Sequence, residues 1–115
     1  QPDSAWSAEG LTVYTTYRII KELYGEAYAK EHYIDQWQTA VDDYYNNFYI
    51  RNPQYLEALP EEKRLDISNQ LSNMRYYNEM PLKILKAEEL LGGEEPMDLI
   101  LYQLFNRDVD PMYPT

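Results

Sequence analysis

Apolar residues recur at three- and four-residue steps along most of the chain, and glycines and prolines separate the segments that carry this pattern. The first segment, residues 7–24, predicts a helix that Gly25 ends. Residues 26–50 predict a second, longer helix, and Asn52-Pro53 ends it or opens a short further turn. One face of the first helix carries the apolar positions Val13, Tyr17, Ile20 and Tyr24.

The second half of the chain repeats this organisation. Pro60, followed by acidic residues, predicts a helix start, and residues 80–91 predict another helix that Gly92-Gly93 stops. A last helix is predicted over residues 95–105, before an irregular tail at 108–115. No alternating strand pattern competes. The prediction is therefore an all-α fold, with about five helices in an orthogonal or bundle-like array and a single domain spanning residues 1–115.

Composition narrows the classes of function. The 115 residues are enough for one domain. Acidic residues outnumber basic ones 20 to 10, so nucleic acid is not an expected partner, because phosphate binding needs a basic surface. There is no cysteine, which excludes thiolate metal sites, and no apolar run is long enough for a membrane span. The 13 tyrosines suit helix faces with polar rims, or alternatively a carbohydrate or peptide groove.

Glu9 is the first residue that suggests chemistry. It lies at helical spacing from Val13 and Tyr17, so we expect it to face inward, where a carboxylate needs a cation, a set of hydrogen bonds or a metal. Gly10 follows inside the same helix, where glycine costs about 1 kcal/mol relative to alanine. A glycine is expected at such a position when another group approaches the backbone closely. The alternative is a half-exposed carboxylate near a helix start.

The sequence around Glu9 resembles a segment of a known enzyme family. Trp6-Ser7-Ala8-Glu9-Gly10, with Tyr14 four residues later, resembles the third zinc-ligand segment of the aminopeptidase N-like zinc metallopeptidases. These are gluzincins, and they include leukotriene hydrolase. The family's His-Glu-x-x-His helix supplies two further ligands, and water takes the fourth, open position of a catalytic zinc site. The resemblance implies that Glu9 is a zinc ligand.

A second stretch resembles the same family. Tyr77 stands fourteen residues before Leu91, in a segment that runs into Leu90-Leu91-Gly92-Gly93. In the family, a tyrosine at this spacing donates a hydrogen bond to the oxyanion of the tetrahedral intermediate. The resemblance implies this catalytic role for Tyr77, with Tyr76 as the neighbouring alternative. The sequence departs from the family's Lys-Gly after this tyrosine, since Glu79 and Met80 stand there.

Other residues do not complete a site. The one histidine, His32, is not in a His-Glu-x-x-His motif, and we expect it to be an ordinary helix-side residue. Adjacent acidic residues diverge on a helix, so we expect solvated faces at these pairs. They are Asp42-Asp43, Glu61-Glu62, Glu88-Glu89 and Glu94-Glu95.

The resemblance implies that this chain is the C-terminal helical lobe of a thermolysin-like zinc peptidase domain. The missing partner is an N-terminal lobe with His-Glu-x-x-His, its second His nineteen residues before Glu9. The intact protein would bind zinc and cleave peptide or protein substrates. The chain alone is expected to bind no zinc and to be inactive, and its exposed lobe face could associate copies into a homo-oligomer.

The alternative interpretation is a non-catalytic helical interaction or peptide-binding domain in which tyrosines line a groove. It predicts that Glu9 forms a salt bridge with a lysine or arginine of this chain. The partner of Glu9 therefore separates the two interpretations.

Overall fold

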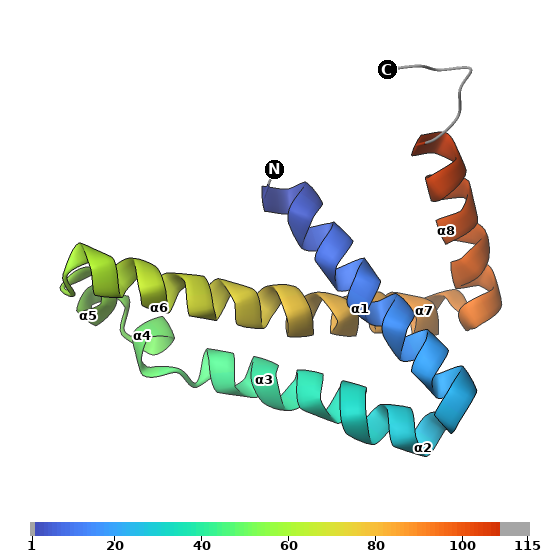
Figure 1. The fold of residues 1–115 in the computed structure, drawn as a ribbon, viewed down its shortest axis with the longest axis horizontal. Helices are drawn as coiled ribbons and strands as arrows, with labels where there is room; N and C mark the ends of the chain where they lie inside the picture. Colours follow the sequence, from blue (N-terminus) through green and yellow to red (C-terminus); the bar gives the residue numbers. More distant parts are fainter. Residues whose placement is uncertain (1, 109–115) are drawn as a thin grey trace. The chain divides into compact units, whose positions relative to one another are not determined.

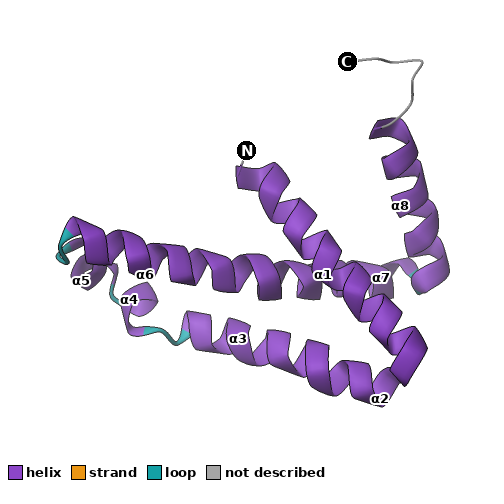
Figure 2. Ribbon diagram, viewed as in Figure 1, coloured by secondary structure: helices purple, strands orange, loops and turns teal. Residues whose placement is uncertain are grey.

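The structure is a computed structural model that describes residues 2–108, with side chains for residues 8–104 and Asn106. Its described residues are helical except at short turns, and none of them forms a strand (Figure 2). The predicted all-α class is confirmed. Where helices joined by a π-turn are counted as one, the described residues form six helical segments, and about five were expected. The chain divides into two compact units, residues 1–84 and residues 85–115.

The first helix, α1 (Pro2–Tyr24), ends where the sequence predicts. Gly25 has a φ of 97°, a backbone conformation that glycine adopts without the steric penalty of a side chain. Its N–H donates to the Lys21 carbonyl at 2.9 Å, closing the last turn of α1. The chain then reverses into the next helix within one residue.

The next rod is formed by α2 (Glu26–Ala29), the π-turn η1 (Lys30–Ile34) and α3 (Asp35–Tyr45). The predicted end of this helix at Ile50 is wrong, because the rod stops at Tyr45. Asn47 then caps the separate short helix α4 (Phe48–Arg51), its side-chain oxygen accepting from the Tyr49 N–H at 2.8 Å. Asparagine side chains compete with the backbone for such hydrogen bonds, so they interrupt helices and begin new ones.

The short turn expected at Asn52-Pro53 is present as α5 (Pro53–Glu57), with Pro53 at its start. The long rod that follows consists of α6 (Glu61–Met74), the π-turn η2 (Arg75–Glu79) and α7 (Met80–Leu91). Pro60 occupies the N-cap position of α6 and not the first helical position as predicted.

The helix predicted over residues 80–91 is present as α7, but no turn separates it from the preceding helix, because η2 joins the two. In η2 the Met80 N–H donates to the Arg75 carbonyl, five residues back, in place of the α-helical partner four residues back. This wider turn lies directly before Pro81, whose ring has no N–H and would clash in an ordinary helix interior. The π-turn therefore lets a buried proline sit within a continuous helix.

The rod ends at Gly92-Gly93, as predicted, and α8 (Glu94–Asp108) begins one residue before and ends three residues after the predicted helix. The tail predicted to be irregular lies, beyond Asp108, outside the described residues. Large apolar side chains of the second unit are exposed, among them Leu90, Leu99 and Tyr102. Within residues 2–108, no helix combines the length and the apolar character that crossing a membrane requires.

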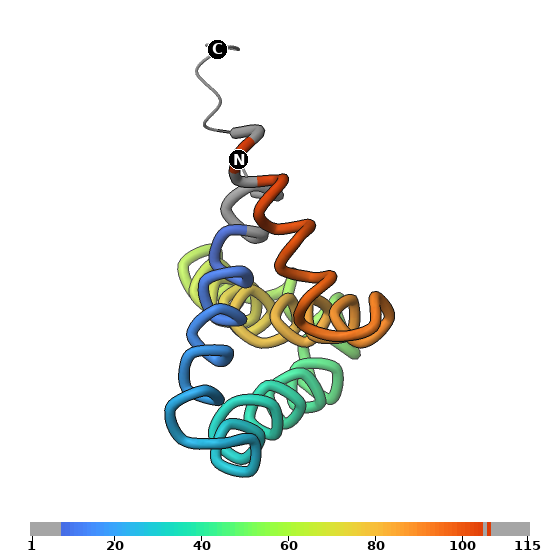
Figure 3. The backbone as a smooth tube through the Cα atoms, turned by 90° about the vertical axis from the view of Figure 1, so that its right-hand side faces the viewer, coloured from blue at the N-terminus to red at the C-terminus, as the bar shows by residue number. Residues whose placement is uncertain are grey.

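In the first unit, η2 packs against both α1 and α3. Figure 1 shows α3 running antiparallel beside α6, while α1 crosses the rod near η2. In the turned view, α3 and the α6–η2 rod lie one above the other with α1 beside both (Figure 3). Two segments distant in sequence thus meet at the π-turn.

Aromatic rings form the core between α1 and the second rod. Tyr17 meets Trp37 edge-on, with ring centroids 5.5 Å apart, and Tyr33 meets the same indole at 6.1 Å. Tyr14, Tyr17 and Trp37 are 1%, 5% and 4% exposed. Such edge-to-face pairs contribute about 0.5–1.5 kcal/mol each beyond the burial of their area.

The buried line of α1 agrees with the predicted one at Tyr17 and differs from it elsewhere. It consists of Gly10, Tyr14 and Tyr17, whereas Tyr24 of the predicted stripe is 62% exposed. The Arg18 guanidinium lies over the Tyr14 ring, and the Lys21 ammonium over the Tyr17 ring, at 5.7 and 5.8 Å. The long apolar stems of these charged side chains lie over the core. Charged residues therefore border the buried face of α1, which makes that face hard to recognise from the hydrophobic pattern.

Replacing Tyr17 by alanine should destabilise the fold by about 3 kcal/mol, because it empties the centre of this aromatic core. Tyr24→Ala on the same helix is the matched control, and it should cost less than about 1 kcal/mol because its ring is exposed. Urea unfolding followed by the fluorescence of Trp37 measures both. Equal losses in the two variants would contradict this location of the core.

Candidate functional site

Glu9 and Tyr77, the two residues singled out by the sequence, lie together in the structure. Glu9 is on α1 and Tyr77 is in the middle of η2. The Tyr77 hydroxyl lies close enough to the Glu9 carboxylate for that charge to raise the pKa of the phenol, although 68 positions separate the two residues in the sequence. This contact belongs to the packing of α1 on η2. The fold thus brings a carboxylate and a phenol to one place on the surface.

Gly10 makes this approach of the two helices possible. A Cβ atom at Gly10 would overlap the Met80 side chain, and Met80 follows η2 directly. The expectation that a group lies close to the backbone at Gly10 is therefore confirmed, and that group is Met80. Any larger residue at position 10 would force α1 away from η2 and would separate Glu9 from Tyr77.

Glu9 itself differs from the sequence expectation, because its side chain is exposed and does not face inward. Gly10 occupies the inward position, and Glu9 stands beside it at the edge of the helix contact. Among the described side chains, the partner of Glu9 is the Tyr77 hydroxyl, and no lysine or arginine forms an ion pair with it. The neighbouring Tyr76 is half-buried, whereas Tyr77 is 43% exposed.

The negative charge of Glu9 raises the pKa of the Tyr77 phenol above its ordinary value, because ionising the phenol would place a second negative charge beside the carboxylate. The phenol therefore keeps its proton and remains a hydrogen-bond donor throughout the neutral range. Because the folded-state pKa is the higher one, the stability from this contact is present below pH about 10 and is lost as the pH rises through the folded-state pKa.

A second carboxylate, Glu79, lies at the end of η2 and is 9% exposed. Arg75 Nε donates to its Oε1 at 2.8 Å, and Lys83 Nζ lies 3.3 Å from its Oε2. From α3, the Tyr45 hydroxyl donates to both oxygens at 3.2 and 3.3 Å. The Arg75 guanidinium also lies 5.5 Å from the centre of the Tyr44 ring. Glu79 thus joins its own rod to α3.

Burial alone would raise the pKa of Glu79, but the hydrogen bonds and charges of Arg75 and Lys83 outweigh it and leave the pKa below its usual value. The charged form is therefore the stable one in the folded chain. Glu79 was not among the residues that the sequence singled out for its contacts. The signal was present, because Arg75, Glu79 and Lys83 stand four residues apart, the spacing of neighbours on a helix face.

The remaining candidate residues stay apart from this site. His32 is exposed, as expected, and its ring lies 4.1 Å from that of Tyr28. The acidic pairs are mostly solvated, but Glu88 is 7% exposed, which contradicts the expectation for that pair. Glu88 has an interaction partner, which offsets the cost of burying its charge. Within the described residues, no three acidic, histidine or cysteine side chains are grouped as metal ligands.

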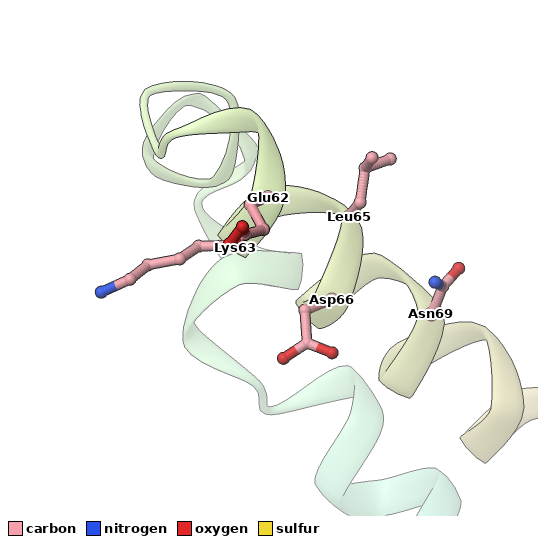
Figure 4. Close-up of a pocket in the computed structure, with 5 residues that line it drawn as sticks. All are labelled: Glu62, Lys63, Leu65, Asp66 and Asn69. Atoms are coloured by element: carbon pink, nitrogen blue, oxygen red, sulfur yellow. The ribbon is translucent and has the colours of Figure 1, made fainter.

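A surface depression of about 400 Å³ lies on α6 and is lined by Glu62, Lys63, Leu65, Asp66 and Asn69. Figure 4 shows these side chains spread around one helix, with Leu65 and Asp66 pointing to opposite sides. They do not converge on one point, as the polar groups of a ligand site do. The contact of Glu9 with Tyr77 therefore remains the candidate site.

Comparisons with protein-family models, with characterised proteins and with solved structures give no match to this chain. The candidate site is thus defined by the contacts of its own residues. These are an exposed carboxylate, a phenol close to it, and a glycine that brings their two helices together.

Replacing Glu9 by glutamine should lower the pKa of Tyr77 towards its ordinary value of about 10, because the negative charge that opposes ionisation is removed. NMR titration of tyrosines labelled at the ring Cζ measures this pKa, with Tyr77→Phe used to assign the signal. Glu22→Gln, which removes an exposed carboxylate from the same helix, should leave the Tyr77 pKa unchanged. An unaltered titration in Glu9→Gln would refute the contact.

Glu79 should make the fold sensitive to acid. Because its pKa is depressed, its contribution to stability is present above its unfolded pKa of about 4.3 and is lost as the pH falls through the folded-state value. Glu79→Gln should cost about 1–2 kcal/mol at pH 7 and should reduce the loss of stability between pH 5 and pH 3, each value being approximate. Urea unfolding at several pH values measures both effects, and an unchanged pH profile would show that Glu79 contributes nothing to it.

Proposed function

We propose that this chain is the helical part of the catalytic domain of a zinc-dependent peptidase, of the aminopeptidase N-like type. In this proposal Glu9 is the carboxylate ligand of the zinc and Tyr77 is the residue that stabilises the oxyanion. The carrying observation is that the packing of α1 on η2, with Met80 against Gly10, brings Glu9 and Tyr77 close together. Two segments that resemble different parts of one catalytic site, on separate helices, meet at one point of the surface.

The surroundings of Glu9 suit a metal ligand. Its carboxylate is exposed and has no lysine or arginine partner among the described side chains, so its charge is available to a cation. Zinc accepts carboxylate oxygen together with imidazole nitrogen. This chain supplies one such ligand, and the proposal assigns the other two to a His-Glu-x-x-His helix outside residues 1–115. A bound zinc would polarise the scissile carbonyl and lower the pKa of a water molecule.

Tyr77 has the properties required of an oxyanion donor. Its hydroxyl lies at the carboxylate proposed to hold the metal, and the raised pKa keeps the phenol protonated. A protonated phenol can donate to a carbonyl oxygen that gains negative charge as water attacks the peptide bond. Its 43% exposure leaves it accessible to a substrate. The ring is held on η2, between α1 and α3, so the donor is carried by packed helices.

The test uses the chain joined to the segment that precedes it in the intact protein. Glu9→Gln should strongly reduce bound zinc and abolish peptide hydrolysis. Tyr77→Phe should retain zinc but lower kcat by about 100-fold to 1000-fold, as loss of one oxyanion donor does elsewhere. Metal analysis and hydrolysis of amino-acid amides and peptides measure these effects.

Tyr76→Phe is the matched control, because it removes a neighbouring hydroxyl and should leave kcat within a few-fold of the unmodified enzyme. Residues 1–115 alone should bind zinc no better than a generic acidic protein in calorimetry. Tight stoichiometric zinc in the isolated chain, or full zinc content in Glu9→Gln, would contradict the proposal. So would a preceding segment that lacks the histidine pair.

A helical interaction domain is the second candidate, and exposed aromatic rings favour it. Phe48 on α4 and Tyr55 on α5 are 56% and 54% exposed, with ring centroids 5.4 Å apart. This hypothesis predicted that Glu9 would pair with a lysine or arginine, whereas its described partner is Tyr77. It also requires that Glu9→Gln leave the metal content of the intact protein unchanged, so the same experiment separates the two candidates.

A further inference from the structure

We propose that the carboxylate of Glu79 is a positioning group, which holds the π-turn η2 in the register that places Tyr77 beside Glu9. The sequence draws attention to this place, because Glu79 and Met80 are where the chain departs from the family it resembles. The contacts of Glu79 lie within residues 1–84 and do not depend on zinc binding by Glu9.

The π-turn decides which way Tyr77 points. A turn closed by a bond between residues five apart contains one residue more than an α-helical turn. Removing that residue would rotate the part of the helix after the turn by about 100° relative to the part before it. Tyr77 lies inside the turn, and Met80, which packs at Gly10, follows it directly. The contacts of η2 with α1 therefore depend on keeping the turn as it is.

Glu79 is connected on both sides of this turn. Arg75, at its first residue, donates to one carboxylate oxygen, and Lys83, beyond Pro81, lies at the other. The two cations are four residues before and four residues after Glu79, so one buried carboxylate spans the segment that contains the unusual bond and the proline. This segment lacks a regular hydrogen-bond ladder, because Pro81 has no N–H.

Glu79 also fixes the rod against α3. The Tyr45 hydroxyl donates to both of its oxygens, and the Arg75 guanidinium lies over the Tyr44 ring. Residues two apart on a helix do not face each other, so Tyr77 and Glu79 point to different sides of the turn. Glu79 holds the side next to α3, and Tyr77 is presented to Glu9 on α1. A change at Glu79 is thus transmitted to the site through the turn itself.

The experiment compares the response of Tyr77 to its neighbour with and without Glu79. In the full chain, labelled at the tyrosine ring Cζ, Glu9→Gln should shift the Tyr77 signal at neutral pH. In the Glu79→Gln background this shift should be lost. Amide exchange in residues 75–80 should accelerate by about tenfold or more relative to the amide of Leu71 in α6.

Glu89→Gln is the matched control, because it removes the same charge from α7 at an exposed pair with Lys86, 3.8 Å apart. It should leave both the shift and the exchange rates unaltered. A merely stabilising role for Glu79 would lower the unfolding midpoint and preserve the Tyr77 response to Glu9→Gln, and that result would overturn the proposal. If Glu79→Gln does not fold, Lys83→Met and Tyr45→Phe each remove one contact of the carboxylate. Retention of the full Tyr77 response in both of these folded variants would equally overturn it.

Discussion

The close approach of α1 to the π-turn η2 is the constraint on which the rest of the first unit depends. It exists because Gly10 has no side chain where Met80 packs. From this point the buried line of α1 continues through Tyr14 and Tyr17 into the aromatic core. The same contact brings Glu9 to Tyr77. The aromatic core and the candidate site therefore both depend on the absence of a side chain at Gly10.

The two carboxylates near η2, Glu79 and Glu9, are chemically alike but lie in different environments. Glu79 is buried, and two cations and a tyrosine hydroxyl satisfy its oxygens, so its charge is used within the fold. Glu9 is exposed, and its described partner is a neutral phenol, so its charge is not cancelled. In a chain with a formal charge of -10, an uncancelled carboxylate is common. Glu9 differs from most of them in its place, beside a closely packed glycine and near the Tyr77 phenol.

The sequence predicted the helical class and the stops at Gly25 and Gly92-Gly93, because these depend on local backbone preferences. It also indicated that Gly10 lies at a close contact and selected Glu9 and Tyr77, which the fold brings together. The roles proposed for these two residues rest on the resemblance and stay predictions.

The failures have identifiable causes. The helix predicted from Met80-Pro81 is present with the predicted bounds, but the expected break before it is absent, because the π-turn η2 joins it to α6. The apolar pattern continues to Ile50, which led to a predicted helix end there. Asn46 and Asn47 end the helix earlier. Arg18 and Lys21 cover the rings of Tyr14 and Tyr17. The predicted line of α1 therefore included Tyr17 but missed Tyr14, and it placed Glu9 inward where Gly10 stands.

The π-turn also has a consequence for how this chain can vary in length. The π-turn contains one residue more than an α-helical turn, so it is equivalent to a one-residue insertion in a regular helix. Deleting one residue between Arg75 and Glu79 would restore an ordinary helix and turn everything beyond it by about 100°. Related sequences that keep the contacts of α1 and α3 should therefore keep the number of residues between Leu71 and Pro81, even where the residues themselves differ. In this segment we expect the number of residues to be conserved more strictly than their identity.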